Sequence, residues 1–299
     1  MATQTLRKHV WLINTIHNHP GISFREINDR WQDSDLSEGN ELPLRTFHKW
    51  RNAIYKVFGL KIDWRDSSGY FIANDDEIKD GTVRKWLMDN ISVSNMLMSN
   101  LALKDRILLE EVPSGKDYLN TILEAMKTNT VLSFTYQGFG RRNAHTFDLH
   151  PYCVKLFKQR WYMLGYSPSE DRLRIYALDR VGNIELQDGK TFSMPRNFNA
   201  EEFFMSFYGI IVNDDKESER ILVKVSAKQA RYLKSLKLHW SQDIVESNDE
   251  YTIFKYNLCP VYDFMQELLS HGADLEVLEP QWLREEIAEK TESMYKLYH

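Results

Sequence analysis

The stretch "KQRWYMLGYSPSEDRLRIYALDR", residues 158–180, decides how the middle of the chain folds. Two short runs rich in aromatic and branched residues flank the segment "SPSED", in which Pro, Ser and Asp favour a turn. The pattern therefore predicts a β-hairpin. Strict alternation in the first strand places Trp161 and Met163 on one face and Arg160 and Tyr162 on the other.

The second strand of this hairpin carries its cations on one face. Alternation groups five residues there: Arg172, Arg174, Tyr176, Leu178 and Arg180. Such a face is a poor core, but it suits an anion with aromatic rings, because guanidinium groups bind phosphates and tyrosine rings stack on bases. The alternative is that the arginines are solvated or pair with the neighbouring acids Glu170, Asp171 and Asp179.

Further short strands surround the hairpin, and they predict a small, strongly bent antiparallel sheet or barrel. They read "VLSFTY" and "AHTFDLHPYCVKLF", and the second strand of the hairpin continues as "LRIYALDRVGNIEL". The preceding "YLNTILEAMKTN" predicts a helix with one apolar face made of Leu119, Ile122, Leu123 and Met126. Upstream, "SGK" lacks the first glycine of a phosphate-binding loop, and Asp117 stands where that loop needs Ser or Thr, so we interpret it as a break between helices.

The first eighty residues predict three helices followed by a hairpin. Apolar residues at helical spacing end at "HPG", and Ser23 with Glu26 forms a capping box that starts a second helix. Pro43 suits the first turn of a third. The segment "LKIDWRDSSGYFIAN" then reads as two short strands joined at residues 66–69. This order is typical of a winged helix-turn-helix, whose last helix enters the major groove of DNA.

The third helix has a basic face opposite an apolar one. The predicted apolar face consists of Phe47, Trp50, Ile54, Val57 and Phe58. We predict that Arg45, Lys49 and Lys56 contact phosphates and that Arg45, His48 or Asn52 reaches base edges. Two alternatives remain: a merely solvated face, and a winged helix that contacts only protein.

Composition restricts the class of protein. The chain has 299 residues, 42% of them hydrophobic and 27% charged, which indicates a globular protein of about two domains or more. The net charge of −5 argues against coating of nucleic acid by the whole chain, yet residues 43–61 hold five cations and no acid. Without a long apolar run, a signal peptide or more than two cysteines, we expect a cytoplasmic protein that does not enter the membrane.

The remaining patterns predict neither an enzyme nor a cofactor site. The histidines are scattered, and no metal-ligand spacing or Ser/His/Asp arrangement has local support, so we predict no catalytic residues and no metal. A Met- and Leu-rich helix over 86–103 is either a dimer contact or core packing. The last third of the chain reads as βαββαβα.

The stretch "HPYCVKLFKQRWYMLGYSPSEDRLRIYALDRVGNI" resembles the WYL domain family, named for a Trp-Tyr-Leu strand that reads Trp161-Tyr162-Met163 here. The upstream "LSFTYQGFGRRNAHTFDLHP", the preceding "HPY" and the closing "LDRV" match the family pattern in the same order. The resemblance spans roughly residues 118–190 and implies an Sm/SH3-like barrel.

The resemblance also implies an α+β multidomain plan. Its parts are a winged helix-turn-helix (1–80), a helical connector (81–117), the WYL barrel (118–192), a linker (193–216) and a C-terminal extension of ferredoxin-like α/β plan (217–299). Regulators of this family bind operator DNA through the winged helix, form homodimers and sense a ligand through the barrel, in some members a nucleotide or single-stranded nucleic acid. The alternative is an accessory protein that binds single strands through the barrel and uses the winged helix for protein contacts.

The resemblance implies which residues line the ligand site. They are Tyr136, Arg141 or Arg142, His150, Tyr152, Tyr162, Arg172, Arg174 and Arg180, with Lys155 and Arg160 as additional cations. His150 has an alternative role as a strand-packing residue.

Overall fold

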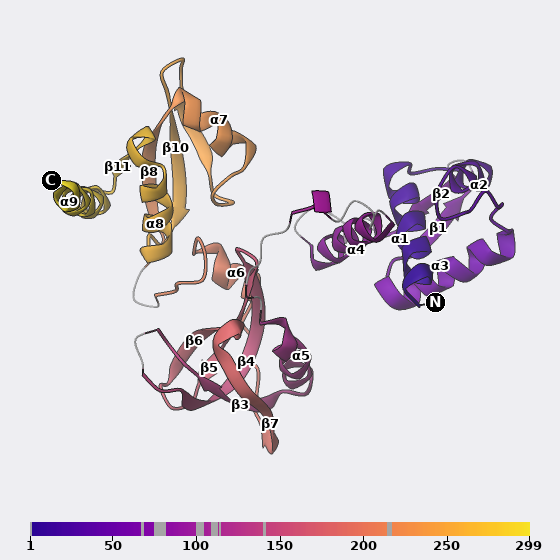
Figure 1. Ribbon diagram of the computed structural model, residues 1–299, viewed down its shortest axis with the longest axis horizontal. Helices are drawn as coiled ribbons and strands as arrows, with labels where there is room; N and C mark the ends of the chain where they lie inside the picture. Colours follow the sequence, from indigo (N-terminus) through magenta and orange to yellow (C-terminus); the bar gives the residue numbers. More distant parts are fainter. Residues whose placement is uncertain are drawn as a thin grey trace. The chain divides into compact units, whose positions relative to one another are not determined.

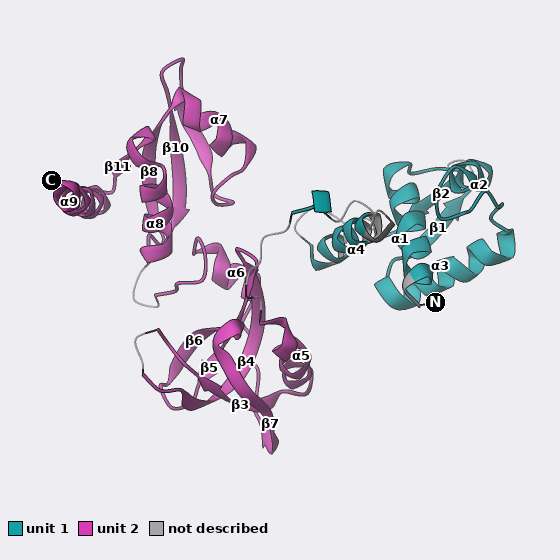
Figure 2. Ribbon diagram, in the orientation of Figure 1, with its two compact units in different colours: residues 1–110 teal, residues 111–299 magenta. Residues whose placement is uncertain are grey.

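The computed structural model describes residues 2–66, 69–74, 82–99, 105–108, 113, 115–139, 142–213 and 217–299. The chain divides into two compact units, residues 1–110 and residues 111–299 (Figure 2). Within the described residues, no helix combines the length and the apolar character that crossing a membrane requires.

Unit 1 begins with three helices and a hairpin in the predicted order (Figure 1). Its elements are α1 (Ala2–Asn18), α2 (Phe24–Gln32), α3 (Leu44–Phe58), β1 (Ile62–Arg65), β2 (Gly69–Ile72) and α4 (Val83–Ser99). The predicted capping box is present: Ser23 Oγ accepts from Glu26 N at 3.2 Å, and Ser23 N donates to the Glu26 carboxylate at 2.9 Å. Pro43 immediately precedes α3, and Gly59 ends it in the left-handed region with φ of 67°.

The core of unit 1 contains most of the predicted apolar face of α3. Phe47, Trp50 and Ile54 are buried there with Trp31, whose ring meets that of Trp50 edge-on at 5.1 Å. The prediction for Val57 is wrong, because its side chain is 60% exposed. At 3.6 residues per turn, position 57 falls at the margin of the stripe, where no partner covers it.

The helix α4 joins the core of unit 1 through Met88, which is only 1% exposed. This contact agrees with core packing as the role of at least the first half of the Met- and Leu-rich helix. The helix is described to Ser99, and the rest of the predicted segment, residues 100–103, lies outside the described residues. Residues 67 and 68 of the predicted hairpin turn lie outside them as well.

Unit 2 begins with a five-stranded antiparallel sheet preceded by a helix. Its elements are η3 (Lys116–Tyr118), α5 (Leu119–Thr128), β3 (Thr130–Tyr136), β4 (His145–Phe157), β5 (Arg160–Ser167), β6 (Arg172–Ala177), η4 (Leu178–Arg180) and β7 (Val181–Thr191). The strand order is β6-β5-β4-β3-β7. From α5, Ile122 and Ala125 enter the sheet core beside Phe134, whereas Leu123, predicted on the same face, is 48% exposed.

The last predicted strand of this sheet is divided. The sequence pattern runs without a break through residues 178–180, but the structure places the 3₁₀ turn η4 there, between β6 and β7. A distant glycine packs closely against this turn. A Cβ on Gly115 would lie 2.4 Å from the backbone nitrogen of Asp179, so only glycine lets the two segments pack this closely. This contact gives the glycine of "SGK" a packing role.

The rest of unit 2 is a second antiparallel sheet with helices. After α6 (Ala200–Met205) come β8 (Glu219–Ser226), α7 (Ala227–Ser235), β9 (Asp243–Ser247), β10 (Tyr251–Leu258), α8 (Tyr262–Ser270), η5 (Gly272–Asp274), β11 (Leu275–Glu279) and α9 (Gln281–Tyr298). The element order is βαββαβα, as the sequence predicts, and the strand order is β11-β8-β10-β9. Phe254, Tyr256 and Phe264 fill its core. The mixed class with helices and antiparallel sheets is therefore confirmed.

Candidate nucleic-acid interface and ligand pocket

The outward face of α3 carries the predicted DNA-contact residues. All five side chains are exposed: Arg45, His48, Lys49, Asn52 and Lys56. The three cations and Asn52 lie half a turn away from the buried Phe47 and Ile54. Within the described part of unit 1, none of the three cations forms an ion pair with a carboxylate. We name the five residues the α3 stripe.

Arg51 belongs to the same basic stretch but turns the other way. Its guanidinium donates to the carbonyl oxygen of Ile62 through Nη2 at 2.5 Å and through Nε at 3.2 Å. It also lies over the Tyr70 ring, 5.4 Å from the centroid. Arg51 therefore ties α3 to the hairpin and is not a member of the α3 stripe.

The hairpin of unit 1 adds two side chains that sequence reasoning did not single out. Trp64 is 52% exposed, and the Arg65 guanidinium lies over the Phe71 ring at 4.3 Å. Lys61, at the start of the hairpin, is paired with Asp63 at 2.7 Å. The signal for Arg65 was its place in the predicted wing, the part of such modules that touches the DNA backbone.

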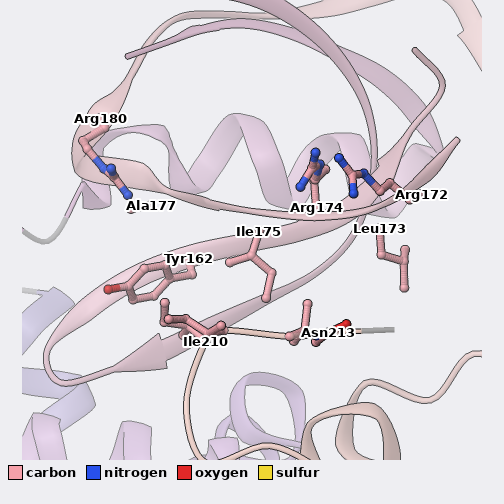
Figure 3. A pocket seen from close by; sticks show the side chains of 11 residues that line it. Tyr162, Arg172, Leu173, Arg174, Ile175, Ala177, Arg180, Ile210 and Asn213 are labelled. Atoms are coloured by element: carbon pink, nitrogen blue, oxygen red, sulfur yellow. The ribbon is translucent and has the colours of Figure 1, made fainter. Parts of the chain in front are cut away.

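Unit 2 contains a pocket of about 530 Å³ along β6 (Figure 3). It brings together four of the predicted ligand residues: Tyr162, Arg172, Arg174 and Arg180. Leu173 and Ile175 form its apolar floor, and residues 210–213 close the opposite side. The mixture of a ring, aliphatic groups and guanidinium groups suits a ligand with a flat part and a negative part.

Strand register separates these residues into two faces. Tyr162 pairs with Ala177 and therefore shares the outer face of the sheet with Leu173 and Ile175. Arg172 and Arg174 alternate with that face and lie on the other side of β6 (Figure 3). Tyr176, predicted beside the arginines, is 5% exposed and packs in the core of the five-stranded sheet against Phe134. The arginines thus edge the pocket, and Tyr162 faces into it.

Glu170 holds both arginines of β6. Arg172 Nη2 lies 3.0 Å from a Glu170 oxygen, and Arg174 donates to the same oxygen. The hydrogen bond from Arg174 lowers the pKa of Glu170, and that from Arg172 adds to it. The alternative that these arginines pair with a neighbouring acid therefore describes this structure, although Arg172 remains 55% exposed.

A second arginine group lies around η4. Arg160 Nη2 donates to Asp179 at 2.6 Å, and the Arg180 guanidinium lies between the rings of Tyr136 at 5.1 Å and Phe139 at 4.2 Å. Burial raises the pKa of Tyr136, against the opposing effect of Arg180. The Nε atoms of Arg160, Arg174 and Arg180 are buried without a hydrogen-bond partner among the described residues. Unpaired buried donors cost free energy, so an acceptor that reaches them stabilises the site.

His150 and Tyr152 lie outside this pocket. The His150 ring stacks on Phe192 with centroids 4.8 Å apart and planes 9° apart, and burial lowers its pKa. Tyr152 contacts Phe198 at 5.0 Å, and burial raises its pKa. These rings form a packing cluster, which agrees with the alternative role for His150.

The other predicted cations are also separate from the pocket lining. Lys155 donates through Nζ to the carbonyl oxygen of Gly209 at 2.6 Å, and burial lowers its pKa to about 8. Arg142 is exposed and its carbonyl accepts from Gln137 at 3.3 Å. Arg141 lies outside the described residues. Across the described ranges, no three His, Cys, Asp or Glu side chains come together in a way that could hold a metal ion.

Sequence reasoning missed several parts of the pocket. Residues 210–213 line the pocket, and Phe139, outside the lining, lies against Arg180. The apolar run "GIIV" inside a polar connector was the one signal for residues 210–213. Gly115, which packs against η4, had no signal at all, since its contact joins segments far apart in sequence.

The fold and the pocket define a multidomain protein with a small antiparallel sheet domain and a second α/β module. Family models give these two parts their identity: a WYL domain matches residues 117–186, and a WCX domain matches residues 217–295. The chain therefore contains a WYL domain match followed by a WCX domain match, and the resemblance seen in the sequence is confirmed.

Among the solved structures that resemble the chain are those of two proteins. Proteasome accessory factor B/C (PafBC) of Arthrobacter aurescens is 15% identical, with a TM-score of 0.38, and the similarity covers 96% of this chain and 46% of that one. The chain thus spans about half the length of PafBC. A CRISPR Cas-related protein is 11% identical, with a TM-score of 0.38 and coverage of 99% and 84%. No curated protein sequence matches the chain.

Proposed function

We propose that this protein is a ligand-responsive regulator that binds duplex DNA through α3 and an anionic nucleotide or single-stranded nucleic acid through the WYL barrel. The observation that carries the proposal is the α3 stripe. Its three cations are exposed and, within the described part of unit 1, unpaired with carboxylates, on the helix that precedes a hairpin. In modules with this order of elements, that helix is the one that enters the major groove.

The chemistry of the α3 stripe fits a DNA duplex. Arg45, Lys49 and Lys56 supply charge for phosphates, while Asn52 can bind an adenine edge with its amide and His48 lies beside it. On the hairpin, Arg65 adds a cation at the place where a wing meets the DNA backbone. Few cations are involved, so the affinity falls with salt less steeply than that of a strongly basic protein.

The chemistry of the pocket fits a nucleotide unit. Its volume of about 530 Å³ is that of an ordinary small-ligand site. Tyr162 offers a ring on which a base can stack, and the arginines at the edge offer guanidinium groups for a phosphate. This is binding chemistry, and we assign the chain no catalytic step.

Regulation requires that the ligand favour one arrangement of the protein. In the proposed mechanism two chains form a homodimer, and the ligand binds with different affinity to the arrangements that do and do not fit an operator. DNA and ligand then influence each other's affinity by the same factor.

The test is a fluorescence anisotropy titration with duplex DNA from upstream of the protein's own gene, with and without a short single-stranded oligonucleotide. Duplex binding that the single strand modulates, with modulation lost in the double variant Arg172→Ala/Arg174→Ala, supports the proposal. If the protein binds the single strand but not the duplex, and the double variant loses this binding, the result contradicts the proposal. It then supports an accessory protein that binds single strands.

A further inference from the structure

Residues 207–213 run between the barrel and the WCX module, and we call them the strap. Four of them, residues 210–213, line the pocket opposite Leu173 and Ile175 (Figure 3). The strap belongs to neither sheet, and it forms one side of the pocket. The groups that hold the strap in place therefore determine the width of the pocket. Those groups come from both modules.

The WCX module holds the strap by its backbone. Asp263, in the first turn of α8, accepts from the backbone nitrogens of Ile210 and Ile211 through one oxygen, at 2.9 and 3.0 Å. Hydrogen bonds to a charged acceptor are stronger than neutral ones. The same two residues line the pocket, so Asp263 directly contacts residues of the pocket wall.

The barrel holds the strap from the other side. Lys155, on β4, donates to the carbonyl oxygen of Gly209 at 2.6 Å, and its ammonium lies 3.9 Å from the centroid of the Phe204 ring. A Cβ at position 209 would lie 2.5 Å from the Asp263 carboxylate and 2.8 Å from the Phe157 ring. A side chain at this position would therefore have to displace Asp263, Phe157 or the strap itself.

Two further contacts restrict how the strap can move. The Tyr208 hydroxyl donates to Glu267 of α8 at 2.6 Å, and Lys158 of the barrel donates to the same oxygen at 2.9 Å. Ile211 and Val212 pack against a small apolar cluster that includes Cys259 and Val261. Each end of the strap is thus tied to the WCX module.

We propose that Asp263 is a positioning residue for the ligand pocket, and that the WCX module is in this way a part of the WYL site. The inference rests on the proposed ligand-binding function and adds to it a second module that sets affinity. A ligand that moves residues 210–213 must also strain or release the bonds to α8. Ligand binding in the pocket is then coupled to the WCX module through the hydrogen bonds of Asp263.

The first test is an affinity measurement on the full chain with a fluorescein-labelled ten-residue oligothymidylate as the probe. Asp263→Ala removes the acceptor, and Gly209→Ala displaces the strap while the acceptor stays. We expect each to weaken binding about tenfold. The matched control is Glu289→Ala, which removes an exposed acid of α9 and should leave affinity unchanged. Thermal unfolding of all variants identifies any that fail to fold. Wild-type affinity in both strap variants overturns the inference.

The second test needs no ligand. Hydrogen exchange of the Ile210 and Ile211 amides should be at least tenfold faster in Asp263→Ala than in the wild type, with core amides of β10 unchanged. Unchanged exchange at both amides overturns the inference. If these amides respond but the wild type binds no oligonucleotide, the proposed ligand fails and the positioning of the strap by Asp263 stands.

Discussion

The arginines and lysines of α3 and those of the barrel are the same residue types in opposite settings. On α3, Arg45, Lys49 and Lys56 are exposed, and no carboxylate in the described part of unit 1 pairs with them. In the five-stranded sheet domain, Arg160 is bound to Asp179, and Arg172 and Arg174 are bound to Glu170. In the proposed function, the exposed cations meet a large, uniformly charged partner, and the cations held in fixed positions meet a small ligand.

The two sets of cations also differ in the side-chain freedom and counterions that they lose on binding. A solvated lysine gives up side-chain freedom and counterions when it meets a phosphate, so its contribution depends strongly on salt. A barrel arginine is already ordered by its carboxylate, and less freedom remains to be lost. However, the paired carboxylate competes with the ligand for the guanidinium, which lowers the affinity for the ligand.

The largest expected effect is on DNA binding by the α3 stripe. Replacing Arg45, Lys49 and Lys56 together by alanine should weaken duplex binding about 100-fold near 0.1 M salt and make the logarithmic salt slope shallower by about 2.7. The matched control removes the exposed cations Lys228, Arg231 and Lys237 from the WCX module. Equal losses in the two triple variants would show that only overall charge matters.

A smaller effect is expected on the affinity for a single-stranded oligonucleotide, with opposite signs for the β6 arginines and for Glu170. Arg172→Ala/Arg174→Ala should weaken binding of a single-stranded oligonucleotide at least tenfold, because two guanidinium groups are lost. Glu170→Gln should strengthen it a few-fold, since the competing carboxylate becomes neutral. Isothermal titration calorimetry measures both. Weaker binding in Glu170→Gln would mean that the acid is needed to orient the arginines.

Arg51 and Lys49 lie on the same helix but are expected to have different roles, one in stability and one in DNA binding. Arg51→Ala removes the hydrogen bonds to the carbonyl of Ile62 and the contact with the Tyr70 ring, so unfolding should become easier by about 1–2 kcal/mol. Thermal denaturation followed by circular dichroism measures the change. Lys49→Ala serves as the control, with an unchanged melting temperature. A stable Arg51→Ala protein would remove the distinction between the two residues.

A further expected effect is a pH dependence from Lys155. Burial lowers its pKa from 10.5 to about 8, so between these values the unfolded chain keeps a proton that the folded chain has lost. The free energy of unfolding contributed by Lys155 should therefore rise with pH from about 8 to 10.5 and stay constant below about 8. Urea unfolding of the wild type and Lys155→Met at several pH values isolates this contribution. A difference that is independent of pH contradicts a buried, shifted amine.

Local chemistry explains which parts of the fold were predictable. Ser23 and Glu26 cap α2 through bonds three residues apart, and Pro43 precedes α3, so the sequence contains both partners of each signal. Alternation in β5 and β6 also holds in the structure. The error at Val57 came from the edge of a helical stripe, where periodicity alone does not tell which neighbour covers a side chain.

The candidate site was predictable only in part, because its contacts are long-range. The sequence pattern pointed to Arg172, Arg174 and Arg180 but could not show the break at η4 or the close approach of Gly115 to it. It could not show that His150 and Tyr152 pack against Phe192 and Phe198 instead of facing the pocket. The strap is also the product of tertiary contacts, because Asp263, which accepts from its backbone, lies about fifty residues further along the sequence.

The most direct test of the account is the salt dependence of duplex binding for the wild type, Lys49→Ala and Arg51→Ala. The account predicts that Lys49→Ala lowers the slope of log K against log salt by about 0.9, the value for one phosphate contact. Arg51→Ala should keep the wild-type slope. If Lys49→Ala left both the affinity and the slope unchanged, the α3 stripe would not be the DNA-binding surface.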